Sequence, residues 1–146
     1  MKLKDILRIK GYRVWSVRSN ESLRQALEIL VREKIGALLV LNWRGEITGI
    51  LSERDIVRGC QLNAWDLSAL KVEDLMTKGV IVAGPDDDVR DVMAVMTKYR
   101  IRHIPVVGEF GLEGMISIGD VVKSTLEESA EEVKHLKDFI FGELAG

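Results

Sequence analysis

Residues 100–120, RIRHIPVVGEFGLEGMISIGD, decide the fold, because an altered copy of this stretch lies upstream in the same chain. Residues 34–40 (KIGALLV) align with residues 100–106 (RIRHIPV) at an offset of 66. Residues 49–55 (GILSERD) align with residues 114–120 (GMISIGD) at an offset of 65, so one deleted loop residue explains the slip. A repeat of this length indicates that one supersecondary unit has been used twice.

Hydrophobic periodicity predicts the same series of elements in both copies, and hence a mixed α/β (α+β) fold of two β-α-β-β-α repeats. For the first copy it predicts a strand at 12–17, a helix along 23–31 capped by Ser19-Asn20, strands at 37–41 and 47–51, and a helix from Ser52. For the second copy it predicts a strand at 80–83, a helix at 86–99, strands at 104–107 and 112–116, and a helix from Ser117. Pro105 lies inside a strand run, which predicts an edge or a bulge there because proline has no N–H for the ladder.

Residues 127–144 lie outside the repeat and predict an amphipathic terminal helix. Its apolar residues advance by three or four positions: Leu126, Ala130, Val133, Leu136, Ile140 and Leu144. Such a stripe packs either on its own chain or against another subunit. The predicted organisation is a first repeat with its connection at 1–70, a second repeat at 71–125 and the terminal helix at 126–146.

Composition argues against several classes of function. The chain has 146 residues and a formal net charge of −2, which provides no basic field for nucleic acid. No apolar run approaches the length of a membrane span, and the first ten residues are too charged for a signal peptide, so we expect a cytoplasmic protein with no membrane partner. The single cysteine, Cys60, excludes an intramolecular disulfide. No nucleophile is paired with a base, so we expect no catalytic residues, no metal site and no enzyme activity.

The chemistry of the chain is expected at its two Gly-x-x-Ser-x-x-Asp segments, which end in Asp55 and Asp120. Each segment follows a strand and opens a helix, so one interpretation is a capping box that satisfies backbone N–H groups. The other interpretation is a nucleotide site. There the helix N-terminus binds a phosphate, the Ser52 or Ser117 hydroxyl assists, and the carboxylate accepts from a ribose diol. Both interpretations need the same geometry, and the sequence leaves both open.

Six segments occur in order along the two repeats: 14–17 (VWSV), 35–40 (IGALLV), 49–55 (GILSERD), 74–77 (DLMT), 102–107 (RHIPVV) and 114–123 (GMISIGDVVK). Together they resemble a tandem pair of cystathionine-β-synthase (CBS) domains, of the stand-alone prokaryotic regulatory type. The resemblance covers nearly the whole chain except the terminal helix. It implies two repeats related by a pseudo-twofold axis, a homodimer, and two clefts that bind an adenine nucleotide. AMP is the expected ligand, with ADP, ATP, an NAD-type cofactor or S-adenosylmethionine as alternatives.

In this family each cleft combines strand-edge residues of one repeat with the Ser-x-x-Asp of the other. The resemblance therefore implies a first cleft of Thr77, Lys78, Val80, Arg102, His103, Ile104 and Pro105 with Ser52, Arg54 and Asp55. It implies a second cleft of Arg13, Val14, Ser16, Gly36, Ala37 and Leu38 with Ser117 and Asp120. Gly36-Ala37 stand where the other repeat has Arg102-His103, so anionic nucleotides are expected to prefer the first cleft.

Three functions follow from these expectations. The first is an adenine-nucleotide sensor for energy sensing or signal transduction, which regulates an unidentified protein partner. The second is a ligand-free dimerisation scaffold in which the two serine-aspartate pairs act only as helix caps. The third is a sensor of S-adenosylmethionine.

Overall fold

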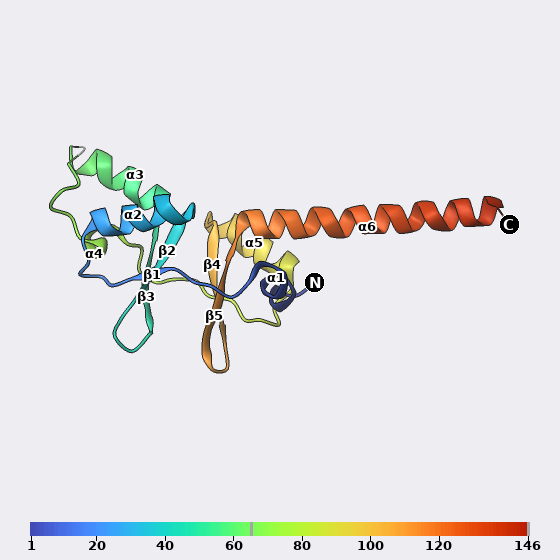
Figure 1. Cartoon of the computed structure of the whole chain (residues 1–146), viewed down its shortest axis with the longest axis horizontal. Helices are drawn as coiled ribbons and strands as arrows, with labels where there is room; N and C mark the ends of the chain where they lie inside the picture. Colours follow the sequence, from blue (N-terminus) through green and yellow to red (C-terminus); the bar gives the residue numbers. More distant parts are fainter. Residues whose placement is uncertain (65, 146) are drawn as a thin grey trace. The chain divides into compact units, whose positions relative to one another are not determined.

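The computed structural model describes the backbone of residues 1–64 and 66–145, and the side chains of these ranges up to residue 142. The chain forms two compact units: residues 13–81, here the first-repeat unit, and residues 1–12 with 82–146, here the second-repeat unit. Both units combine helices with a small sheet, which confirms the predicted α/β class (Figure 1). The repeat boundaries predicted at residues 70 and 125 stay a prediction. The compact units are divided differently, because residues 1–12 pack with the second repeat.

The first-repeat unit is a three-stranded sheet with helices. Strand β1 pairs in parallel with β2, and β2 pairs antiparallel with β3, in the order β1-β2-β3. Helix α2 begins after Ser22, whose side chain accepts from the Gln25 N–H at 3.2 Å, so the predicted cap at Ser19-Asn20 is wrong. The Ser22 and Gln25 side chains form a capping box that the earlier pair lacks. The elements are β1 (Ser16–Val17), α2 (Leu23–Glu33), β2 (Ala37–Leu41), β3 (Ile47–Ser52), α3 (Glu53–Leu62) and α4 (Val72–Leu75).

The second-repeat unit contains a helix that periodicity did not predict. Helix α1 buries Leu3, Ile6 and Leu7 in the core of this unit, together with residues of the second repeat such as Val92 and Ile116. The spacing of these three apolar residues was the available signal, although the lysines around them obscure it. The elements are α1 (Leu3–Lys10), α5 (Val89–Tyr99), β4 (His103–Gly108), β5 (Gly111–Ser117) and α6 (Ile118–Ala145).

The strand predicted at residues 80–83 is reduced to one bridge, in which Ala83 pairs in parallel with Val106. Pro105 provides the reason. At the equivalent position of the first repeat, the Leu39 N–H donates to the Trp15 carbonyl at 3.2 Å and extends the parallel ladder. Pro105 has no N–H to donate, so the ladder here is limited to the two bonds of Ala83. The Ala83 N–H donates to the Pro105 carbonyl at 3.0 Å, and the Ala83 carbonyl accepts from the Val107 N–H at 2.8 Å.

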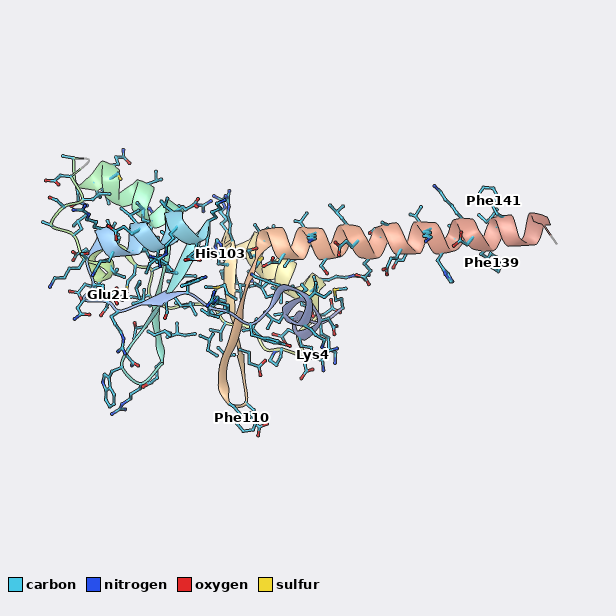
Figure 2. All side chains as sticks on the ribbon, in the orientation of Figure 1. Lys4, Glu21, His103, Phe110, Phe139 and Phe141 are labelled. Atoms are coloured by element: carbon cyan, nitrogen blue, oxygen red, sulfur yellow. The ribbon has the colours of Figure 1, made fainter. Side chains whose placement is uncertain are left out.

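Helix α6 is a single helix of 28 residues, which joins the last helix of the second repeat to the predicted terminal helix without a break. Its C-terminal part extends away from the rest of the second-repeat unit, and Phe139 and Phe141 project from opposite sides of it (Figure 2). Leu126, Val133 and Leu136 are also exposed, whereas the side chain of Leu144 lies outside the described residues. Within the described chain, no helix combines the length and the apolar character needed to cross a bilayer.

Candidate functional site

Ser52 and Asp55 stand at the N-terminus of α3 in the first-repeat unit and form a reciprocal cap. The Ser52 hydroxyl accepts from the Asp55 N–H at 3.3 Å. The Asp55 Oδ2 accepts from the Ser52 N–H at 2.9 Å and from the Ser52 hydroxyl at 3.0 Å. Asp55 is 7% exposed, so its carboxylate is buried among these neutral donors. The capping interpretation is therefore satisfied in the first repeat.

Thr77 provides a further donor to the same carboxylate, because its hydroxyl donates to Asp55 Oδ1 at 2.9 Å. The Thr77 backbone is held against β3, where its N–H donates to the Ile50 carbonyl at 2.8 Å and its carbonyl accepts from the Ile50 N–H at 3.0 Å. This two-way bridge positions the side chain. Three residues predicted for the first cleft, Ser52, Asp55 and Thr77, thus meet within one unit. Lys78 and Arg54 are exposed, and Val80 is half-buried.

The strand-edge residues predicted for the second cleft also belong to the first-repeat unit. Ala37 lies opposite Ser52 in the β2–β3 ladder, and the Gly36 carbonyl accepts from the Glu53 N–H at 3.0 Å. Leu38 is fully buried in the core, so only its backbone is positioned to meet a ligand. Val14 is half-buried, and Ser16 is exposed at the start of β1.

The second-repeat unit repeats this arrangement around Ser117 and Asp120 at the N-terminus of α6. The Asp120 Oδ2 accepts from the Ser117 N–H at 2.9 Å, and the Ser117 hydroxyl accepts from the Asp120 N–H at 3.2 Å. His103 lies opposite Ser117 in the β4–β5 ladder, at the first residue of β4 (Figure 2). The Arg102 carbonyl accepts from the Ile118 N–H at 2.8 Å, and the Arg102 side chain is exposed.

Ile104 and Pro105 follow His103 in β4, and both are buried. Ile104 is part of the hydrophobic core of the second-repeat unit. Its side chain therefore stabilises the fold, and the backbone of this strand is the part suited to a ligand.

Lys10, at the end of α1, is a site residue that the sequence analysis missed. Its Nζ lies 2.5 Å from Asp120 Oδ2 and donates to the Met115 carbonyl at 2.7 Å. Burial raises the pKa of Asp120. The hydrogen bond and positive charge of Lys10, together with the hydrogen bonds from Ser117, outweigh burial and hold this pKa below its ordinary value. No sequence signal joins Lys10 to Asp120, because the two residues are 110 positions apart.

The glycine of each Gly-x-x-Ser-x-x-Asp segment has a structural role. A Cβ on Gly114 would lie 2.6 Å from Leu7 Cδ2, and a Cβ on Gly49 would lie 2.8 Å from the sulfur of Met76. Helix α1 packs directly on β5 through Leu7, and Met76, which follows α4, packs directly on β3. The glycines are therefore explained by close packing, without a ligand.

The described residues show no group of three or more His, Cys, Asp or Glu side chains placed to hold a metal ion. What they offer is two buried or half-buried carboxylates, each at the start of a helix and each surrounded by hydroxyl, amide or ammonium donors. Such a site suits the recognition of a polar small molecule through hydrogen bonds.

Comparison with known proteins identifies the class to which this fold belongs. The family model of the CBS domain matches twice, at residues 3–61 and 72–127. The chain therefore belongs to the CBS domain family and carries two copies, as the resemblance predicted. A curated relative is the mitochondrial CBS domain-containing protein CBSX3 of Arabidopsis thaliana. It is 33% identical over 96% of this chain and 72% of its own length.

Solved structures share the fold. The CBS-domain containing protein ATU1752 from Agrobacterium tumefaciens has a TM-score of 0.82 and 36% identity, over 85% of this chain and 92% of that one. The CBS domain pair of protein MJ0100, in complex with 5′-methylthioadenosine and S-adenosyl-L-methionine, has a TM-score of 0.75 and 29% identity, over 86% and 99%. CBSX2 in complex with AMP has a TM-score of 0.70 and 25% identity, over 88% and 98%.

Proposed function

We propose that this protein is a regulatory module that binds an adenine nucleotide, with AMP as the first candidate, and that it is not an enzyme. The observation that carries the proposal is the pair of Ser-x-x-Asp elements at equivalent helix starts, ending in Asp55 and Asp120. Two structural relatives of at least 25% identity were solved with adenosine-containing ligands. ADP, ATP and NAD-type cofactors share the adenosine group and belong to the same proposal.

The chemistry of the elements suits such a ligand. A carboxylate accepts from a ribose diol, and the N-terminus of a helix favours a negatively charged phosphate. Charge-assisted hydrogen bonds of this kind contribute roughly 1.5–3 kcal/mol each. Of the cations predicted for this phosphate, Arg54 and Lys78 belong to the same unit as Asp55, and their side chains are exposed.

A thermal-shift panel of adenosine, AMP, ADP, ATP, NAD and S-adenosylmethionine tests the proposal. A ligand at one hundred times its dissociation constant adds about 2.7 kcal/mol to the stability of the folded protein. Calorimetry then compares the wild type with Asp55→Asn. We expect the affinity for AMP to fall about tenfold or more, because the amide loses the charge that accepts from the diol. The amide oxygen can keep the bonds from the Ser52 N–H and hydroxyl, and the Thr77 hydroxyl can turn to accept from the amide NH2, so stability changes by less than about 1 kcal/mol.

Asp74→Asn is a matched control, because Asp74 is also the acidic residue of a capping box. Its Oδ2 accepts from the Lys71 N–H at 2.8 Å at the start of α4. This variant is expected to leave AMP binding unchanged. If no compound in the panel stabilises the protein, the ligand-free scaffold replaces the proposal. If only S-adenosylmethionine does so, the sensor of that compound replaces it.

The proposal includes a homodimer in which the exposed apolar residues of α6 contact a second copy. Leu126, Val133 and Leu136 are exposed along one stripe of this helix. Exposed apolar surface of this kind is typical of a contact with another protein chain. A regulated protein of unidentified nature and a cytoplasmic location belong to the same proposal. The dimer is tested by removing the helix, as argued below.

A further inference from the structure

The two carboxylates of the Ser-x-x-Asp elements have different partners. Asp55 accepts from the Ser52 amide and from the hydroxyls of Ser52 and Thr77, which are all neutral donors. Asp120 accepts from the Ser117 amide and from the ammonium of Lys10, so the charge at this element is neutralised. Lys10 is held in place by the Met115 carbonyl, to which it also donates.

This difference changes what a ligand must displace. A ribose diol presents two O–H donors, and binding by both carboxylate oxygens needs an acceptor position on each. At Asp55 a hydroxyl can rotate away from the carboxylate at little cost. At Asp120 the Oδ2 already accepts from Ser117 at 2.9 Å and Lys10 at 2.5 Å, which uses both of its lone pairs. A diol that engages both oxygens must break the charge-assisted bond to Lys10.

We propose that Lys10 determines ligand specificity at Asp120, by admitting adenosine compounds that carry an anionic group and rejecting neutral ones. The inference rests on the proposed function. An anionic group, such as the phosphate of AMP, can form a new ion pair with the Lys10 ammonium when that ammonium separates from Asp120. A neutral nucleoside leaves this ammonium without a counter-ion in a half-buried place, which opposes binding.

Calorimetry with AMP and adenosine tests this inference in full-length Asp55→Asn protein, in which the first element is weakened. We expect AMP to bind at least about tenfold more tightly than adenosine, as one charge-assisted hydrogen bond implies. Adding Lys10→Met is expected to reduce this ratio to about threefold or less, because AMP loses its cation and adenosine no longer competes with one. Lys10→Arg keeps the charge and is expected to keep most of the preference.

A measurement without ligand guards against a variant that misfolds. Carboxyl titration by NMR in the wild type and in Lys10→Met should show the pKa of Asp120 rising when the ammonium is removed. An unchanged AMP-to-adenosine ratio in Lys10→Met, or an unchanged Asp120 titration, overturns this inference alone. If wild-type protein binds neither compound, the proposed function fails and this inference fails with it.

Discussion

The Thr77 hydroxyl is the residue-scale contact that best tests the geometry around Asp55. It donates to a carboxylate that is almost completely buried, at 2.9 Å. Thr77→Val keeps the shape of the side chain and removes this donor, so we expect a loss of about 1.5 kcal/mol in the free energy of unfolding. Urea denaturation measures the loss. Thr77→Ser restores the hydroxyl and should regain most of it, and an equal loss in both variants would contradict the hydrogen bond.

The ion pair of Lys10 and Asp120 predicts a pH dependence of stability. The pKa of Asp120 lies below its ordinary value in the folded protein, so the stabilisation is fully present above the pKa of the unfolded chain, about 3.9. It is lost as the pH falls through the lower, folded pKa. Both side chains are partly exposed, so we expect Lys10→Met to cost only about 0.5–1 kcal/mol at pH 7 and low salt.

Urea denaturation of the wild type and Lys10→Met between pH 7 and pH 3 measures this effect. The difference in stability should shrink at the acidic end. Lys134→Met, on the exposed part of α6, is the control and should show little difference at any pH. A difference for Lys10→Met that is the same at pH 7 and pH 3 would argue against the ion pair.

At the scale of elements, the packing of α1 on β5 depends on Gly114. A Cβ at this position would lie 2.6 Å from Leu7 Cδ2, and Leu7 is fully buried, so the side chain has little room to move. We expect Gly114→Ala to destabilise the protein by about 1–3 kcal/mol through overpacking. Chemical denaturation measures this change.

Gly119→Ala, in the first turn of α6, serves as the control for this prediction. Its nearest atom within reach would be Ser117 Oγ at 3.6 Å, which is an ordinary contact. We expect it to be neutral, or stabilising by up to about 1 kcal/mol through helix propensity. If the two variants were equally stable, the close packing of α1 would not hold in solution.

At the scale of the whole molecule, the exposed stripe of α6 predicts self-association. Truncation after Ser124 removes Leu126, Val133, Leu136 and the residues beyond them. Burial of such surface contributes about 25 cal/mol per Å², so we expect the dissociation constant of the dimer to rise by more than about tenfold. Sedimentation velocity over a range of concentrations measures this constant.

Two further variants test whether the dimer depends on the α6 stripe or on any exposed apolar side chain. The double variant Val133→Glu and Leu136→Glu should weaken the dimer without shortening the helix. Phe110→Ala removes a side chain that is 95% exposed at the tip of the β4–β5 hairpin, and it should leave the dimer unchanged. A full-length chain that sediments as a monomer at micromolar concentration would refute the homodimer.

Much of the fold follows from the sequence because its determinants are local. Strand β2 begins and ends as the apolar run at 37–41 predicts, and the caps of α3 and α6 follow from Ser52 with Asp55 and from Ser117 with Asp120. Each of these features depends on residues within a few positions of one another, so periodicity and spacing reveal it. The family follows from the order of the repeated segments.

The tertiary structure alone decided which distant residues meet. The hydroxyl of Thr77 reaches Asp55 across 22 positions, and the ammonium of Lys10 reaches Asp120 across 110. Pro105 shortens the strand predicted at residues 80–83, because the N–H that proline lacks would have paired with that segment, which is distant in the sequence. Side chains brought together by packing leave no periodic signal in the chain. The sequence therefore determined the repeats, the caps and the family, and only the packed units determined which distant donor reaches each carboxylate.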